Sequence, residues 1–500
     1  MLVSTPSGGG SGDSGSGGGG SSVAGQTSSG GKSASGGQPA GTSGQAAAGE
    51  PAKVNGVVIA PADARAGYAS NVQFTALVTG AEQSVTWSIQ EGERGGSIDA
   101  TGLYKAPGTS GSFHVVATST SDAKLTGTAR VTVSAPSGTP PVLVPGTWTE
   151  LTPSDAGLVC CPETGGNSYG VLFVEVDPGD PNTIYTGIDA LGIWKTTDRG
   201  STWKRLGSKD QASAGPKTTY IDTPIRLRVD PADSKHLYAT SGVHGSTMGF
   251  WVSNDGGDNW EMPAGFNDSG KTTTLDVTLM AVDPSDFKHV LLASHSPWKD
   301  MGNAGILESK DGGQSWQSHA PAPSWNAGTV GIAMLYAPAQ GIGDSKTWLV
   351  GTDGNGFWRT TDSGTTWNKV SDSGVPHGGN EIYYTADGVL YAGATPYPMR
   401  SKDNGVTWEQ LNDGLGFSYY YLVYGDGKTL YTSPAYTGTN GGAPLPYYAA
   451  SETSGGAWTP HLPDQKLVDG PYQMKFDAAN GIMYSANFGA GLLALKVIPP

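Results

Sequence analysis

An eight-residue pattern, Ser/Thr-x-Asp-x-Gly-x-x-Trp, recurs through the C-terminal two-thirds of the chain and constrains its fold most. Five full copies end at Trp203, Trp260, Trp316, Trp367 and Trp408, and a sixth, ending at Trp458, has Thr453 in place of the Asp. In each copy the Asp can accept backbone N–H groups in a turn, the Gly tolerates positive φ, and the Trp can pack between sheets. Repeats of 41 to 57 residues suit a four-stranded unit. We therefore expect an all-β fold of repeated sheets.

Residues 146–500 contain strand-like segments for seven such units, which predicts a seven-bladed β-propeller. The last unit, ending at Leu492–Val497, lacks a closing Trp strand. The segment Gly146–Leu151 has the same character as Thr202–Leu206, which closes the first unit. We therefore expect residues 146–151 to complete the seventh blade, because ring closure removes exposed sheet edges.

Two different segments precede the repeats. Residues 1–52 are rich in Gly and Ser and contain no aromatic residue, so they cannot bury enough apolar area to fold and are expected to be a disordered linker. Residues 53–136 contain short runs of alternating or β-branched residues with polar turns, which predicts a β-sandwich in which Trp87 is the large core residue.

Composition excludes several classes of protein. A net charge of −15 argues against nucleic-acid binding. No apolar run of about 18 residues is present, so no transmembrane segment is expected. The eight histidines show no metal-ligand spacing, and we expect neither a metal nor a cofactor. The two cysteines, Cys160 and Cys161, are neighbours; a strained vicinal disulfide, two free thiols and a crosslink to another chain all remain open.

One face of the expected ring gathers the loops that join each unit to the next and the loops between second and third strands. These loops combine aromatic rings, on which sugar faces can stack, with polar groups that bind hydroxyls, as expected for a glycan site. Packing of loop against loop is the alternative. The candidate substrate-binding residues are Tyr169, Tyr220, His244, Trp298, Trp325, His377, Glu381, Tyr420 and Tyr472.

The repeated pattern resembles the Asp-box (BNR) repeats of sialidases and family 74 xyloglucanases. Residues 53–136, with Trp87 and the string Gly102-Leu103-Tyr104-Lys105-Ala106-Pro107, resemble a bacterial Ig-like domain. That second resemblance implies a spacer or adhesive module.

The segment Tyr185–Lys195 resembles the region where family 74 xyloglucanases carry one catalytic Asp, which makes Asp189 a candidate acid or base. Asp276 resembles the context of that family's other Asp. The family takes one Asp from each of two propellers, whereas this chain has the length of one, and this departure puts the pairing in doubt. Sialidase activity is not expected, because it needs three arginines and the inner strands supply Arg226 and Arg228 alone.

These observations lead to a glycan-directed, exported protein, placed outside the cell or on a bacterial surface. The tail resembles the spacer after the lipid-modified cysteine of bacterial lipoproteins, so we expect an export signal and a lipid anchor upstream of the given start; a cytosolic tail is the alternative. The first function hypothesis is hydrolysis of a polysaccharide or glycoconjugate, xyloglucanase-like, through Asp189 and Asp276. A non-catalytic glycan- or protein-binding surface and a docking scaffold are the alternatives.

Overall fold

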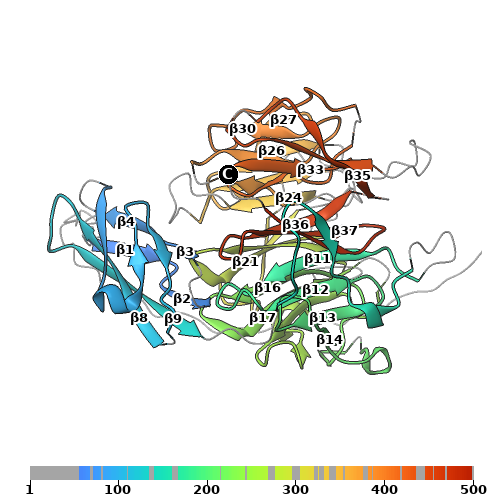
Figure 1. The fold of residues 1–500 in the computed structure, drawn as a ribbon, viewed down its shortest axis with the longest axis horizontal. Helices are drawn as coiled ribbons and strands as arrows, with labels where there is room; N and C mark the ends of the chain where they lie inside the picture. The colour runs from blue at the N-terminus through green and yellow to red at the C-terminus, as the bar shows by residue number, and fades with distance from the viewer. Residues whose placement is uncertain are drawn as a thin grey trace, which may run out of the picture. The chain divides into compact units, whose positions relative to one another are not determined.

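Nearly all the regular secondary structure in the described part of the chain is β-strand (Figure 1). The computed structural model describes residues 56–67, 71–79, 83–109, 111–134, 140–159, 167–213, 215–242, 245–267, 276–294, 305–319, 325, 331–336, 345–352, 355–374, 381–385, 387–416, 419–434, 445–453, 455–467 and 470–497. Within those ranges the single α-helix is α1 (Ala264–Asn267). The prediction of an all-β fold is therefore confirmed, whereas the expected tail, residues 1–52, lies outside the described residues.

Residues 56–134 form three small sheets around one apolar core. Phe74 and Tyr104 fill the centre of this core with no exposed area. Trp87, the expected core residue, is instead half-buried and packs against this core. The sheets run in the orders β1-β4, β2-β9-β8-β5 and β3-β7-β6, from the strands β1 (Gly56–Ala60), β2 (Asp63–Gly67), β3 (Asn71–Gln73), β4 (Thr75–Thr79), β5 (Val85–Ile89), β6 (Ser97–Ile98), β7 (Leu103–Lys105), β8 (Gly111–Ser119) and β9 (Thr126–Ser134).

Residues 148–496 form seven further sheets, numbered here in chain order. The first sheet is β11 (Val171–Val176), β12 (Ile184–Ile188), β13 (Gly192–Thr196) and β14 (Lys204–Arg205); the second is β16 (Pro224–Asp230), β17 (Asp233–Ser241), β18 (Gly249–Ser253) and β19 (Trp260–Glu261), with β15 (Lys217–Thr218) outside β19; the third is β20 (Val277–Asp283), β21 (Asp286–Ser294), β22 (Ile306–Ser309) and β23 (Gln317–His319).

The remaining four sheets follow the same antiparallel order. The fourth is β24 (Gly331–Tyr336), β25 (Trp348–Thr352), β26 (Gly356–Thr360) and β27 (Asn368–Ser371); the fifth is β28 (Tyr383–Tyr384), β29 (Leu390–Ala392), β30 (Met399–Ser401) and β31 (Glu409–Gln410); the sixth is β32 (Tyr424–Gly425), β33 (Thr429–Thr432), β34 (Leu445–Ser451) and β35 (Thr459–Leu467). The seventh sheet combines both ends of the repeat region, since β36 (Pro471–Asp477), β37 (Ile482–Asn487) and β38 (Leu492–Lys496) are completed by β10 (Trp148–Glu150), with Trp148 opposite Leu495.

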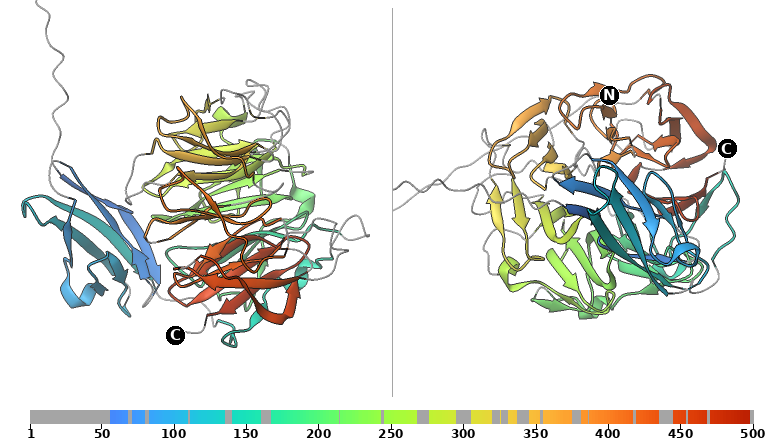
Figure 2. Two further views of the ribbon diagram at one scale, coloured as in Figure 1. Left: turned by 90° about the horizontal axis from the view of Figure 1, so that it is seen from above. Right: turned by 90° about the vertical axis from the view of Figure 1, so that its left-hand side faces the viewer.

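The seven sheets lie around a common centre (Figure 2). Apolar clusters join successive sheets, and one cluster joins the last sheet to the first through Val171 and Val174 on one side and Tyr484 and Ala486 on the other. Their side chains have no exposed area, so this seam is packed like the other contacts between sheets. The first strand of the first sheet, β11, lies beside β16 and β36, the first strands of the second and seventh sheets. The region between these inner strands is called the central channel below.

The repeated Asp holds the turn between the third and fourth strands. In the first sheet Thr196 Oγ1 donates to Asp198 Oδ1 at 2.7 Å, and Asp198 accepts the Thr202 backbone N–H at 2.8 Å. Gly200, at φ +94°, donates its N–H to Thr196 Oγ1 at 2.9 Å. Asp255, Asp311, Asp362 and Asp403 repeat this arrangement, so these residues serve the scaffold.

Candidate active site

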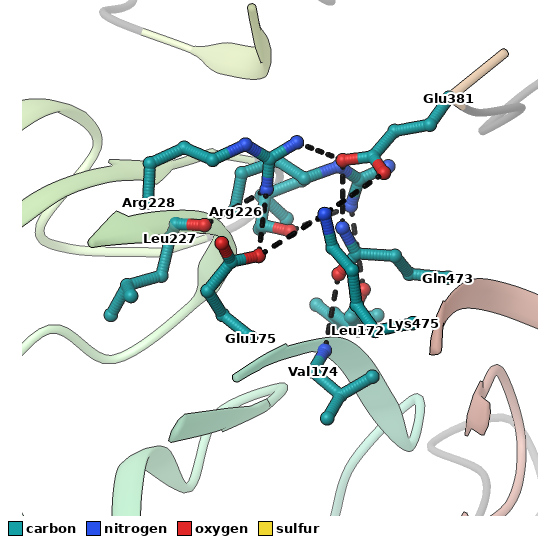
Figure 3. Close-up of polar contacts among 10 residues, drawn as sticks. Leu172, Val174, Glu175, Arg226, Leu227, Arg228, Glu381, Gln473 and Lys475 are labelled. Atoms are coloured by element: carbon teal, nitrogen blue, oxygen red, sulfur yellow. Dashed lines mark hydrogen bonds and ion pairs between the residues drawn. The ribbon is translucent and has the colours of Figure 1, made fainter. Parts of the chain in front are cut away.

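A ring of four charged side chains crosses the central channel (Figure 3). Arg228 of β16 contacts Glu175 of β11 at 3.2 Å and forms an ion pair with Glu381, which lies just before β28. Lys475 of β36 contacts Glu175 at 3.3 Å and Glu381 at 3.5 Å. Each charge thus meets two charges of opposite sign, and the four residues, called the charge ring below, tie together the first, second, fifth and seventh sheets.

The charge ring is electrostatically self-consistent. Burial raises the pKa of the Glu381 carboxyl, but Arg228, Lys475 and Arg226 outweigh burial and lower it well below its usual range. Burial lowers the pKa of Arg228 and of Lys475, yet the two carboxylates leave both above their ordinary values. Gln473 also donates to Glu381 Oε1 at 2.7 Å. Glu381, expected as a sugar ligand, is therefore engaged by ring cations.

Arg226 and Tyr472 form a second polar pair at the channel. Arg226 has no exposed area, and its guanidinium donates to the carbonyl oxygens of Ile225 at 2.6 Å and Leu172 at 3.4 Å. It also donates a hydrogen bond to the Tyr472 hydroxyl and lies 5.0 Å from the centre of that ring. Tyr472 is 8% exposed, and its phenol is thus fixed from one side by a buried cation.

Asp189 and Asp276, the two candidate catalytic residues, are both near this phenol. Burial raises the pKa of Tyr472; Arg226 opposes that rise, and the carboxylates of Asp276 and Asp189 add to it. Residues from the first and third sheets thus act on one side chain of the seventh. Asp189, Asp276, Tyr472 and Arg226 are called the mouth site below.

Local structure explains how each carboxylate is held. Asp189 lies in the turn between β12 and β13, is 7% exposed, and accepts the Tyr169 backbone N–H on Oδ2 at 2.9 Å. Asp276 directly precedes β20, is 6% exposed, and accepts the Ser294 hydroxyl on its backbone carbonyl at 2.7 Å. A Cβ at Gly242 would lie 2.4 Å from Asp276 Oδ1, so glycine is what lets this carboxylate approach the second sheet.

Asp189 also lines an open pocket of about 400 Å³. Asp222 lines the same pocket, but its oxygens accept hydrogen bonds from Ser246 and Thr247, which hold a loop. Burial raises the pKa of Asp222, and these hydrogen bonds outweigh burial and lower it. The pocket lining consists of Asn167, Tyr169, Asp189, Ala190, Lys209, Asp222 and Thr223.

An aromatic cluster extends from this pocket over the seventh and sixth sheets. Tyr169 stacks on Phe488 with centroids 5.5 Å apart, and Phe488 contacts Tyr472 and Tyr421 at 5.9 and 6.3 Å. Tyr419 meets Tyr421 edge-on at 5.9 Å. Tyr169, Phe488 and Tyr419 are partly exposed, so part of this apolar surface faces solvent.

The other predicted binding residues fall into two groups. Tyr220, Trp325 and Tyr420 have at most 1% exposed area and pack inside the fold, Trp325 against Trp358 and Trp367. A substrate has no surface of these three to contact, so the proposed site does not include them. His244, Trp298 and His377, and the cysteine pair Cys160 and Cys161, lie outside the described residues.

The third sheet holds a second buried charged cluster. His289 contacts Asp283 through Nδ1 at 3.2 Å and Glu308 through Nε2 at 2.9 Å, and His319 Nε2 contacts the other Glu308 oxygen at 3.0 Å. Burial lowers the pKa of His289, but these two carboxylates raise it to about 9; burial raises the pKa of Glu308, but its partners lower it to about 2. Here the imidazolium and carboxylates satisfy one another, and no group of three metal-ligating side chains with the placement of an ion site occurs within the described ranges.

Several polar residues at the channel were not predicted from sequence. The only local signal for Glu175, Arg226 and Lys475 is a charged residue inside an otherwise apolar inner strand. Arg226 and Arg228 are two residues apart and therefore share one side of β16, which brings both to the channel.

Comparisons with known proteins point to one enzyme class. No family model matches the chain. It is 26% identical over 307 residues to the oligoxyloglucan-reducing end-specific xyloglucanase of Emericella nidulans, covering 58% of this chain and 35% of that one. It is 32% identical over 296 residues to a xyloglucanase of Acetivibrio thermocellus, covering 49% and 32%. The chain therefore spans about one third of the length of these curated relatives.

A solved structure supports the fold. The GH74 xyloglucanase of Xanthomonas campestris superposes with a TM-score of 0.51 at 16% identity, over 71% of this chain and 54% of that one. At this identity the likeness concerns the arrangement of sheets alone.

No helix in the described part of the chain is long and apolar enough to cross a membrane.

Proposed function

We propose that this chain is a glycoside hydrolase of the xyloglucanase type, acting on a polysaccharide by carboxylate acid/base catalysis. The observation that carries the proposal is the place of Asp189, which lines an open pocket beside a partly exposed aromatic cluster, because glycosidic bond cleavage needs a carboxyl group that the sugar can reach. Asp276 is the second carboxyl group in the proposal. The relatives named as xyloglucanases support the substrate class.

In this proposal one carboxyl group protonates the leaving glycosidic oxygen while the other, ionised, activates the attacking water or attacks the sugar. The tight hold of the Tyr169 backbone N–H on Asp189 fixes one of the two groups. The partly exposed aromatic cluster offers sugar faces a stacking surface beside it.

The finer architecture belongs to the same proposal. Pairing of β10 with β38 and the packed seam between last and first sheets support a closed seven-bladed Asp-box propeller. The three small sheets of residues 56–134 support an Ig-like spacer spanning residues 53–136. A polysaccharide substrate supports a location outside the cell or on a bacterial surface.

A second candidate function is non-catalytic glycan binding. The aromatic cluster favours it, because stacked rings with partial exposure retain a sugar whether or not hydrolysis follows. Binding without product release by the parent protein would select this alternative.

The test is a panel of xyloglucan and β-glucan polysaccharides incubated with the parent, with Asp189→Ala and with Asp233→Asn, a turn carboxylate at the start of β17. We expect reducing sugar from xyloglucan with the parent and with Asp233→Asn, and none with Asp189→Ala. Equal release by the parent and Asp189→Ala removes Asp189 from the mechanism, and no release by the parent removes the enzyme proposal for these substrates.

A further inference from the structure

We propose that Asn487 is a positioning residue for Asp189, which it holds in place through the β37–β38 turn, residues 487–491, and the backbone of Tyr169. This inference rests on the proposed function and deepens it, because it names a residue of the seventh sheet that fixes the candidate catalytic group of the first. Asn487 has no exposed area, so it touches neither the substrate nor the reacting atoms. It acts through its neighbours.

The first step of the argument is how the Asn487 side chain fixes the turn. Its Nδ2 donates to the backbone carbonyls of Ser485 and Gly491, both at 2.9 Å, and the second of these bonds spans the turn from its first residue to its last. Its Oδ1 accepts the Tyr447 hydroxyl at 3.1 Å and the Ser485 hydroxyl at 2.9 Å. Two donors and two acceptors are the full hydrogen-bonding capacity of an amide side chain. The buried Asn487 is therefore held from every polar side.

The second step is the contact between this turn and the segment that precedes β11. The Gly489 N–H donates to the Tyr169 carbonyl at 2.6 Å, and Gly170 and Phe488 form an antiparallel bridge. Gly170 has φ +97°, and a Cβ there would lie 2.7 Å from the Asn487 carbonyl oxygen. The two backbones are thus in direct contact, so a displacement of the turn also displaces Tyr169.

The third step leads from this segment to Asp189. The Tyr169 N–H donates to Asp189 Oδ2 at 2.9 Å, and the Asp189 N–H donates to the Gly170 carbonyl at 3.0 Å. The side chain and the backbone of Asp189 are therefore both bound to residues that the turn holds. Asp189 is 7% exposed and lines the open pocket, so the seventh sheet sets the place of a carboxylate that a substrate can reach.

Tyr447 supports Asn487 from behind and links it to β10. Tyr447 is 1% exposed, and its ring stacks on Trp148 with centroids 4.3 Å apart and an interplanar angle of 18°. Its hydroxyl also donates to Ser485 Oγ at 2.7 Å. Tyr447→Phe removes the hydroxyl and keeps the stacked ring, so it loosens Asn487 less than truncation of Asn487 itself does.

The direct test measures hydrogen–deuterium exchange by mass spectrometry in the parent, Asn487→Ala and Tyr447→Phe. Exchange of the segment 167–171 is expected to become about tenfold faster in Asn487→Ala and about threefold faster in Tyr447→Phe, because the loosened turn no longer fixes the Tyr169 N–H against Asp189.

Asn182→Ala is the matched control. Asn182 is 3% exposed, and its side chain holds a turn through Asp180 Oδ1 at 3.0 Å and the Arg199 guanidinium at 2.7 Å. It precedes β12, whose other end leads into Asp189. The control therefore removes a buried amide from the opposite end of the same strand, and exchange of the segment 167–171 is expected to stay at the parent rate.

Activity on xyloglucan gives a second readout. Asn487→Ala is expected to lower kcat about 10–100-fold, because a displaced Asp189 loses its alignment with the bond to be cleaved. KM is expected to stay within about threefold, because Phe488 keeps its contacts with Tyr421 and Tyr472. Asn182→Ala is expected to keep kcat and KM within about twofold of the parent.

The two readouts separate this inference from the proposed function. If the parent releases no sugar, the hydrolase proposal fails, and exchange of the segment 167–171 still decides whether Asn487 holds the Tyr169 N–H that binds Asp189. If Asn487→Ala does not fold, Tyr447→Phe decides alone. Exchange of this segment at the parent rate overturns the inference, and so does equally fast exchange in Asn182→Ala. In an active protein, an unchanged kcat overturns it as well.

Discussion

The charge ring and the mouth site are neighbouring parts of one channel, and they use buried charge in opposite ways. In the ring, Glu175 and Glu381 each contact Arg228 and Lys475, so each charge meets two charges of opposite sign. At the mouth, Asp189 instead accepts a backbone N–H and lines an open pocket. Buried charges that satisfy one another give a fixed structure, whereas a carboxylate on the lining of an open pocket can meet a substrate. The same residue types therefore serve the scaffold in the charge ring and, in our proposal, the chemistry in the mouth site.

The largest expected difference comes from replacing one carboxylate by an amide in the mouth site and, separately, one in the charge ring. Asp276→Asn is expected to lower kcat/KM for xyloglucan about 10²–10⁴-fold, as loss of a general acid or base does, with little change in the midpoint of thermal unfolding. Glu175→Gln removes a ring charge and is expected to lower the unfolding midpoint with less than about a tenfold change in kcat/KM. An equal loss of kcat/KM in both variants would show that the charge ring and the mouth site form one functional unit.

The next largest effect concerns the ring alone. Arg228→Met leaves Glu175 and Glu381 buried with Lys475 as their remaining ring cation, and we expect a loss of about 3–5 kcal/mol in the free energy of unfolding. Chemical denaturation measures it, with Arg359→Met as the control, because Arg359 bonds to a backbone carbonyl in an outer turn. The double variant Arg228→Met with Glu381→Met is expected to recover part of that loss, since it removes the uncompensated carboxylate. If the double variant loses more free energy of unfolding than the two single variants lose together, this view is contradicted.

The scaffold was predictable because its signals are local. Thr196, Asp198 and Gly200 fix their turn through contacts within a few residues, so the repeat spacing predicts where strands fall. The charge ring was not predictable, because its members come from four sheets; the contact of Val174 with Gln473 beside it spans 299 residues. Nothing in the sequence near Glu175 marks its partners.

The candidate site was predicted in part. Asp189, Asp276 and Tyr472 come from the sequence-derived loops, and Asp189 lines an open pocket, while their catalytic roles stay predictions. The aromatic prediction could not separate the partly exposed Tyr169 from the buried Tyr420, because the same residue type serves a rim and a core. Burial decides between them, and burial depends on which sheet packs behind the loop.

The histidine cluster of the third sheet tests whether mutual satisfaction stabilises charge away from the channel as well. His289→Gln is expected to lower the free energy of unfolding by about 2–4 kcal/mol at pH 6, measured by denaturant titration, because Asp283 and Glu308 lose their shared cation. His236, which contacts Asp230 at the same place in the second sheet, is more exposed, and His236→Gln is expected to cost less than about 1 kcal/mol.

The pH dependence of that effect has a fixed sign. The pKa of His289 is about 9 in the folded chain, above the ordinary value of 6.5, so its stabilisation is complete below pH 6.5 and is lost as pH rises through 9. The stability difference between the parent and His289→Gln is therefore expected to shrink between pH 6.5 and 9. A difference that stays constant over this range would show that the imidazolium contributes nothing through its charge.

The smallest expected effect lies at the mouth and concerns affinity alone. Phe488→Ala removes the ring that stacks on Tyr169 and contacts Tyr472, a loss of about 0.5–1.5 kcal/mol in substrate binding. KM for xyloglucan is expected to rise about 2–10-fold while kcat stays within twofold, since stacking holds bound sugar and transition state alike. Phe287→Ala, in the third sheet, is the aromatic control, because this ring packs on Tyr238 of the second sheet; we expect a loss of stability and an unchanged KM. A fall in kcat with unchanged KM in Phe488→Ala would contradict a role confined to binding, and the boundary between binding surface and mouth site would move accordingly.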